Sequence, residues 1–155
     1  MFRKILACIF IFFLTLCSAF GQQLSSNNKK ALKLYDESRQ LMQTRQFDEA
    51  ISNLDLAISK DPEFIEAYIR LGNLHKSLLD LEKAYANYVS ASRLIRDPRK
   101  FTGIYLSMGS YEFSLGDYEK ASKNLSIYVS ERSTNDRNKR TAEQLLRNCE
   151  FSLSN

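Results

Sequence analysis

Histidine and cysteine are the side chains in this sequence best suited to nucleophilic or metal chemistry, and they are scarce. His75 is the only histidine, and the cysteines are Cys8, Cys17 and Cys149. A cysteine beside a histidine can form an activated thiolate, so a pair of Cys149 and His75 is conceivable. A zinc site needs about four ligands, commonly cysteine and histidine at short spacing. These residues cannot assemble one, and we expect no metal ion or other cofactor.

Structural roles are favoured over catalytic ones for both residues. His75 falls at an inward position of an expected helix, and no partner motif accompanies it, so we expect a core histidine. Cys149 is expected to be a small buried hydrophobe rather than a reactive or intermolecular thiol. The later glycines stand too far apart for a phosphate-binding loop, at Gly72, Gly103, Gly109 and Gly116. The sequence therefore predicts no enzymatic activity.

Length and charge narrow the class of protein further. A chain of 155 residues is one domain on the usual scale of about 100–200 residues per domain. The 22 Lys and Arg residues exceed the 18 Asp and Glu residues, for a formal charge of +4. Arg3 and Lys4 lie in the N-terminal segment, and both signs of charge are interspersed along the rest. A nucleic-acid-binding face is normally a clustered basic patch, so nucleic acid is not an expected partner.

The N-terminus has the layout of a secretory signal peptide. A basic pair is followed by an apolar run that is shorter than the roughly 20 residues of a membrane-spanning helix, and then by small residues. We expect a signal peptide at 1–21, cleavage after Gly21, a polar linker at 22–28 and a soluble product in the periplasm. The alternative is lipidation at Cys17, which would attach the protein to a membrane. Leu16 stands where lipoprotein signals place a small residue, so soluble export is favoured.

One motif occurs three times in the rest of the chain: FDEAISNLDLAIS, LEKAYANYVSASR and YEKASKNLSIYVS. Its alanines are Ala50, Ala84 and Ala121, spaced by 34 and then by 37 residues. A second small residue precedes each alanine by 12 positions, at Ser38, Gly72 and Gly109. A fixed period of this length is typical of stacked structural repeats.

Apolar residues around these small residues recur at helical spacing, which predicts two helices per repeat. We expect helical hairpins at about 29–62, 64–97 and 100–131. Gly72 is expected to face Ala84, because two helices cross closely only where neither has a bulky side chain. A loop and a capping helix are expected at 132–155, with these residues on one face of that helix: Ala142, Leu145, Leu146, Cys149 and Leu153. Its polar side would solvate the end of the stack.

The repeats resemble the tetratricopeptide repeat (TPR). The second repeat matches best, through Tyr68, Leu71, Gly72, Ala84, Tyr88 and Ala91. The first has Ser38 in place of the glycine, and the third has Tyr128 where a small residue is usual and follows a three-residue insertion. The resemblance implies an all-α fold: an α-solenoid of three TPR hairpins plus a C-terminal capping helix.

The third repeat and the final helix also resemble a narrower group. GDYEKASKNLSIYV followed by RNKRTAEQLLRNCEFSL is similar to the N-terminal TPR region of bacterial envelope proteins. Those proteins continue into a β-propeller and an OmpA-like domain that binds peptidoglycan, and some serve type IX secretion. This chain ends at Asn155, where the propeller would begin, so functions of those later domains are not carried over.

The TPR resemblance implies a concave groove lined by the first helix of each hairpin. The corresponding positions here are Tyr35, Arg39, Met42, Ile69, Asn73, Lys76, Leu106, Ser110 and Phe113. Apolar anchors mixed with cationic groups favour a peptide or helix of some acidic character. Asn73 resembles one member of the carboxylate clamp of chaperone-binding TPR domains, but the other clamp positions do not match.

Two functions are compatible with these features. The first is an exported, non-catalytic adaptor that binds a protein partner in the bacterial envelope. The alternative is a structural subunit, or a truncated relative, of a TPR–propeller–OmpA-like envelope protein that supports an outer-membrane or secretion assembly.

Overall fold

The computed structural model describes residues 24–132 and 136–155, which form seven α-helices, one short 3-10 helix and no strand. The predicted signal peptide and Cys17 lie outside the described residues. The elements are α2 (Lys29–Gln43), α3 (Phe47–Lys60), α4 (Ile65–Ser77), α5 (Leu81–Leu94), η1 (Pro98–Phe101), α6 (Thr102–Ser114), α7 (Tyr118–Ser130) and α8 (Arg137–Ser154). The chain is all-α, as expected.

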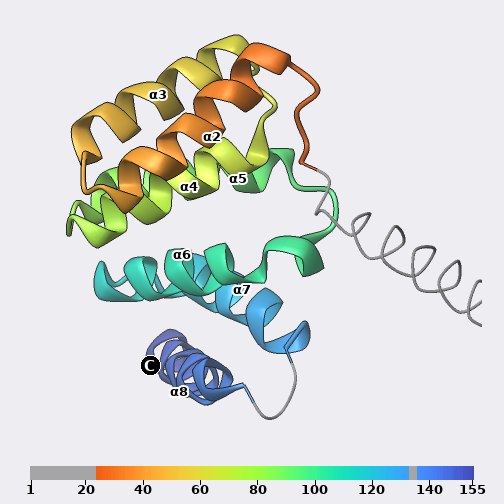
Figure 1. Cartoon of the computed structure of the whole chain (residues 1–155). Helices are drawn as coiled ribbons and strands as arrows, with labels where there is room; N and C mark the ends of the chain where they lie inside the picture. The colour runs from red at the N-terminus through yellow and green to blue at the C-terminus, as the bar shows by residue number, and fades with distance from the viewer. Residues whose placement is uncertain (1–23, 133–135) are drawn as a thin grey trace, which may run out of the picture.

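The helices form three antiparallel hairpins that stack in chain order (Figure 1). The pairs are α2 with α3, α4 with α5, and α6 with α7, and α8 packs on the end of the stack. This arrangement is an α-solenoid, in which each hairpin buries its apolar face against its neighbours. No helix among residues 24–132 and 136–155 is long and apolar enough to span a bilayer.

Small residues allow the two helices of each hairpin to approach closely. A Cβ atom added to Gly72 would lie 2.7 Å from Tyr88 Cε1 and 3.2 Å from the carbonyl oxygen of Ala84. The third hairpin repeats this contact, since a Cβ on Gly109 would lie 3.2 Å from the Ala121 carbonyl oxygen. The expected crossing of Gly72 and Ala84 is therefore confirmed.

The first hairpin has a serine at the position that is glycine in the other two. Ser38 is fully buried, and its hydroxyl donates a hydrogen bond of 2.7 Å to the carbonyl oxygen of Tyr35 one turn earlier. The buried hydroxyl is therefore satisfied within its own helix. Local hydrogen bonding explains why the first repeat accepts Ser38 at a position that is glycine in the others.

The turns inside the three hairpins share one backbone conformation. Arg45, Leu79 and Gly116 have φ angles of 62°, 63° and 77°. The left-handed region is unfavourable for residues with a Cβ atom, so Arg45 and Leu79 are strained where Gly116 is not. The repeat thus extends to the turns, although their residue types differ.

Two elements depart from a uniform repeat. The three-residue insertion before the third hairpin forms η1, a single 3-10 turn whose start is capped by the Asp97 side chain. Residues 24–28, expected as part of a linker, are held against the second hairpin. Ser25 Oγ donates to Glu66 Oε2 at 2.6 Å and accepts from the Ile65 N–H at 2.9 Å. These bonds tie the start of the described chain to α4.

The last helix closes the apolar core at the end of the stack. Ala142 and Cys149 are fully buried, and Leu145 and Leu146 are half-buried against the same core. Leu153, expected on this inward face, is half exposed instead. The contact face of α8 therefore ends about one turn before the helix does.

Candidate functional site

The first helix carries three of the predicted groove residues, and they have different surroundings. Arg39 is exposed, and its guanidinium lies 3.8 Å from the carboxylate of Asp36 on the same helix. Met42 is half-buried against the core of α2, α3 and α4. Tyr35, expected on the groove surface, is buried. Of these three residues, only Arg39 is exposed to solvent.

Tyr35 is covered by a side chain of the second hairpin. The guanidinium of Arg70 lies 3.9 Å from the centre of the Tyr35 ring, and Arg70 Nη2 donates to the Tyr35 hydroxyl at 2.6 Å. Burial raises the pKa of Tyr35, and the charge of Arg70 opposes that rise. The Tyr35 ring is therefore not available to a partner.

The second hairpin places Asn73 and Lys76 on its exposed surface and Ile69 half-buried. Tyr88 donates its hydroxyl hydrogen to Asn73 Oδ1 at 2.7 Å, so part of the Asn73 side chain is already engaged. Lys76 Nζ donates to Ser107 Oγ of the third hairpin at 3.1 Å. Among the described ion pairs, none involves Lys76.

The third hairpin places Leu106 and Ser110 near Lys76 but turns Phe113 elsewhere. Leu106 and Ser110 both line a cavity that Lys76 also borders. Phe113 is half-buried and packs edge-on against Tyr118 of α7, with 5.5 Å between ring centres. Phe113 therefore helps to hold the hairpin together rather than to line the cavity.

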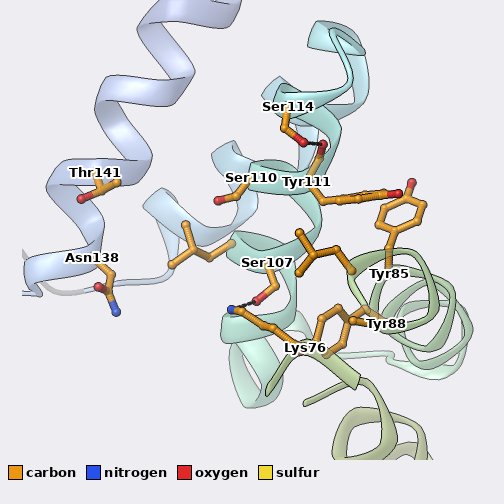
Figure 2. Close-up of a pocket in the computed structure, with 12 residues that line it drawn as sticks. Lys76, Tyr85, Tyr88, Ser107, Ser110, Tyr111, Ser114, Asn138 and Thr141 are labelled. Atoms are coloured by element: carbon orange, nitrogen blue, oxygen red, sulfur yellow. Dashed lines mark hydrogen bonds between the residues drawn. The ribbon is translucent and has the colours of Figure 1, made fainter. Parts of the chain in front are cut away.

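The cavity lies between the second and third hairpins and has a volume of about 380 Å³. Figure 2 shows Tyr85 and Tyr88 of α5, the serines of α6 and the more distant Asn138 and Thr141 of α8 around it. Its lining comprises Lys76, Leu81, Ala84, Tyr85, Tyr88, Leu106, Ser107, Ser110, Tyr111, Ser114, Asn138 and Thr141. Lys76 is the only charged residue among them.

Most of these lining residues were not anticipated from the sequence. Along α5, helical spacing relates Leu81, Tyr85 and Tyr88 and predicts a stripe of core residues. It does not predict which residues of that stripe line a cavity. Ser107 and Ser114 are small polar residues without a motif. The available signal was the run of serines at positions 107, 110 and 114, which leaves one helix face without bulky side chains.

A buried carboxylate fixes one wall of the cavity. Glu112 is only 2% exposed, and its Oε1 accepts a hydrogen bond of 2.8 Å from the Tyr85 hydroxyl. Asn124 Nδ2 donates to both oxygens of Glu112, at 3.0 and 2.7 Å. The tilted rings of Tyr85 and Tyr111 lie 5.0 Å apart. Glu112 thus joins α5, α6 and α7 through side-chain hydrogen bonds.

The titration of the two cavity tyrosines of α5 reflects their surroundings. Burial, followed by the hydrogen bond to Glu112, raises the pKa of Tyr85 to about 12. Burial also raises the pKa of Tyr88. Both hydroxyls are therefore neutral hydrogen-bonding groups at physiological pH.

The histidine and the buried cysteine lie in different environments. His75 is buried at the end of α4, with Nδ1 3.8 Å from the carboxylate of Asp80. Cys149 lies fully buried in the core formed by α5, α6, α7 and α8, and burial raises the pKa of its thiol. Within residues 24–132 and 136–155, no three potential ligands cluster as a metal site would require. Cys149 is a buried residue, as predicted.

Comparison with known proteins identifies the fold. No family model matches the chain, and no curated protein matches it. Solved structures do match, among them the first TPR domain of Spaghetti (RPAP3) bound to the HSP90 peptide SRMEEVD. That match has a TM-score of 0.63 and 22% identity, and it covers 83% of this chain and 97% of that one.

Two further structures extend the comparison. The TPR2B domain of yeast Sti1, in a complex with Hsp70, has a TM-score of 0.59 and 18% identity, over 79% of this chain and 97% of that one. The Yersinia enterocolitica type III secretion translocator chaperone SycD has a TM-score of 0.64 and 10% identity, and the match covers 84% of this chain and 90% of that one. At these identities the likeness establishes the fold alone. The described residues have the fold of tetratricopeptide repeat domains.

Proposed function

We propose that this protein is a non-catalytic adaptor whose concave groove binds a protein partner through an exposed peptide segment. The observation that carries the proposal is the cavity between the second and third hairpins. Its apolar surface comes from leucine and tyrosine side chains, while serine hydroxyls and one lysine border it. Protein pockets of this kind combine apolar surface with a few placed polar groups.

The cationic side chains of the groove favour a partner with acidic residues. Lys76 reaches a serine hydroxyl rather than a carboxylate. Arg39 lies 3.8 Å from Asp36, but both side chains are more than half exposed, so this pair contributes little. Both cations are therefore available to an incoming carboxylate, and complementary charge speeds association and selects the partner.

Proteins of the same fold offer precedents for peptide binding. The Spaghetti domain was solved with an HSP90 peptide that contains three acidic residues, and the yeast Sti1 domain was solved with Hsp70. These partners belong to those proteins. They support the proposal that a fold of this shape presents a groove for a peptide here as well.

The non-catalytic part of the proposal rests on the environments of the candidate nucleophile and base. The Cys149 thiol is enclosed by the apolar core of the last four helices, and its raised pKa disfavours the reactive thiolate. His75 is buried at the end of α4, where its Nδ1 lies 3.8 Å from the carboxylate of Asp80. Neither group faces the cavity that would hold a substrate.

Export to the periplasm is a further part of the proposal, and it is supported by the signal-like sequence at 1–21. The intact mass of the protein recovered from the envelope tests this part. A chain that begins at Gln22 is expected. A diacylated chain that begins at Cys17 would contradict soluble export and would place the adaptor on a membrane.

The second candidate function is a structural subunit of an envelope assembly related to TPR–propeller–OmpA-like proteins. The observation that favours it is the apolar end of α8, where Phe151 is 72% exposed and Leu153 is half exposed. Exposed apolar side chains often mark a contact surface. Replacing both by serine would weaken docking in this case but would leave peptide binding in the groove unchanged.

Capture of envelope proteins by the mature chain tests the primary proposal. The variant Arg39→Glu with Lys76→Glu should lose the partner at low salt, and the loss should shrink as salt rises. The matched control is Lys30→Glu with Lys123→Glu, two exposed lysines outside the described ion pairs and the cavity lining. If the two variants bind the partner with equal affinity, the groove is not the binding surface. The candidate is then the basic start of α8, at Arg137, Lys139 and Arg140.

A further inference from the structure

The turns of the second and third hairpins carry exposed leucines. Leu79 is 83% exposed and Leu115 is 66% exposed, while Leu78 and Leu81 are nearly half exposed. Leu79 also has a φ angle of 63°, a conformation that is unfavourable for leucine. A large apolar side chain that is both strained and solvated gains nothing within the described fold, and such residues cluster at functional surfaces.

These leucines are continuous with the cavity. Leu81 and Ser114 line it, Leu79 lies two residues before Leu81, and Leu115 directly follows Ser114. Lys76 also lines the cavity, and its ammonium lies beside Ser107, seven residues before Ser114 on α6 (Figure 2). The cavity therefore reaches the hairpin turns at Leu81 and Ser114. We term Leu78, Leu79, Leu81 and Leu115 the leucine rim.

The leucine rim is not a requirement of the repeat. In the first hairpin, Thr44 and Arg45 follow Ser38 by six and seven positions. In the second, Leu78 and Leu79 follow Gly72 by the same numbers of positions, so the two pairs correspond. Arg45 shares the left-handed backbone of Leu79. The fold thus accepts polar residues at these turns, and the apolar ones are confined to the hairpins that enclose the cavity.

We propose that the cavity and the leucine rim form one docking surface for a peptide segment that combines two large apolar side chains with an acidic residue. One apolar side chain fills the cavity between Tyr85, Tyr88 and Leu106. The carboxylate lies beside Lys76, and the second apolar side chain covers the leucine rim. This inference rests on the proposed function and adds the chemical class of the peptide.

Charge complementarity is the argument for the acidic residue. Lys76 is the only charged residue among the twelve that line the cavity, and the carboxylate of Glu112 behind the wall is buried and already bonded to Tyr85 and Asn124. An acidic peptide therefore meets one cation that is in none of the ion pairs of the described residues, and no anion among the twelve lining residues. The serine hydroxyls at 107, 110 and 114 can donate to peptide carbonyl groups.

Selection from a random peptide library displayed on phage tests the inference without knowledge of the natural partner. The wild-type mature chain is expected to enrich peptides in which an acidic residue stands close to two large apolar residues. One enriched peptide is then synthesised with a fluorescent label, and its Kd is measured at low salt on each variant.

Four variants locate the bound peptide. Lys76→Glu should weaken binding by about tenfold at low salt, and Lys123→Glu on α7, the matched control, should leave it unchanged. Ser110→Phe fills the cavity and should weaken binding by about tenfold or more, whereas Leu79→Gly should weaken it by about threefold. Helical circular dichroism checks the folding of each variant. Lys76 is exposed, so Lys76→Glu remains decisive even if Ser110→Phe does not fold.

The outcomes separate this inference from the proposed function. Enriched peptides that lack an acidic residue, or that bind Lys76→Glu and Ser110→Phe as tightly as wild type, would overturn the inference while the protein would still be a peptide binder. A selection that enriches no peptide would overturn the proposed function and the inference together. Acidic, apolar peptides with the stated losses on the variants would support both.

Discussion

The interface between the first and second hairpins is covered at Tyr35, whereas the interface between the second and third leaves a cavity. At the first, Arg70 of α4 lies over the ring of Tyr35 and bonds its hydroxyl. At the second, the residue that corresponds to Arg70 is Ser107, because each stands two positions before the glycine of its helix. A short side chain there leaves the cavity that Tyr85 and Tyr88 line.

The difference shows that one repeat motif can build two kinds of surface. The contacts within hairpins are alike, since Gly72 and Gly109 approach the carbonyl oxygens of Ala84 and Ala121 in the same way. The contacts between hairpins depend on side chains that the motif does not specify. Stability is therefore expected to reside in the shared contacts, and binding specificity in the variable ones.

The largest expected effect is on a contact within a hairpin. Gly72→Leu should lower the free energy of unfolding by about 3 kcal/mol, because its Cβ would lie 2.7 Å from the buried ring of Tyr88. Gly103→Leu should change it by less than about 0.5 kcal/mol, since a Cβ there meets nothing within 4 Å. Chemical denaturation measures both. Equal losses would contradict the assigned register of the hairpins.

The next effect concerns the contact that covers Tyr35 between the first and second hairpins. Arg70→Ser copies Ser107 into the second hairpin and should cost about 2 kcal/mol, through the lost contact with the Tyr35 ring and the lost hydrogen bond. The pKa of Tyr35 should also rise, because Arg70 lowers it. Denaturation and absorbance titration measure the two effects. The reciprocal Ser107→Arg should fill the cavity and weaken peptide binding at nearly unchanged stability.

A smaller effect concerns the cavity wall and its dependence on pH. Tyr85→Phe removes the hydroxyl that donates to Glu112 and should cost about 1 kcal/mol at neutral pH. The folded-state pKa of Tyr85 is raised to about 12, above the ordinary value of 10.0. This stabilisation is therefore complete below about pH 10 and is lost as pH rises through 12.

Paired unfolding measurements on wild type and Tyr85→Phe at neutral and alkaline pH test this sign. The stability difference between the two proteins should shrink between pH 10 and 12. In an alkaline absorbance titration of the folded protein, the ionisation near pH 12 that belongs to Tyr85 should be absent from the variant. A difference that grows with pH would mean that Tyr85 is not the donor to Glu112.

The smallest expected effect distinguishes the role of the Leu79 side chain from the role of the turn backbone. Leu79→Gly should change the free energy of unfolding by no more than about 0.5 kcal/mol, since relief of the left-handed strain offsets the greater freedom of glycine in the unfolded chain. Arg45→Gly, at the equivalent turn of the first hairpin, should change stability in thermal unfolding by as little as Leu79→Gly does. Only Leu79→Gly should lower peptide affinity. A similar loss for Arg45→Gly would show that turn flexibility, rather than the leucine, matters.

Much of the fold was predictable, and the groove was predictable only in part. The spacing of Ser38, Gly72 and Gly109 from their alanines indicated the hairpins, since close helix crossing requires small residues at fixed positions. The groove positions Lys76, Leu106 and Ser110 do border the cavity. Tyr35 and Phe113 do not, because neighbouring side chains cover or engage them.

The sequence by itself determined the all-α repeat, because helical periodicity and the contact between small residues act over short stretches of chain. It also determined the residue types at the turns, with leucine at position 79 and arginine at position 45. Only the tertiary structure decided which side chains remain open. Arg70 covers Tyr35 across 35 positions and Lys76 meets Ser107 across 31. Such contacts depend on how successive hairpins stack, which no local pattern specifies.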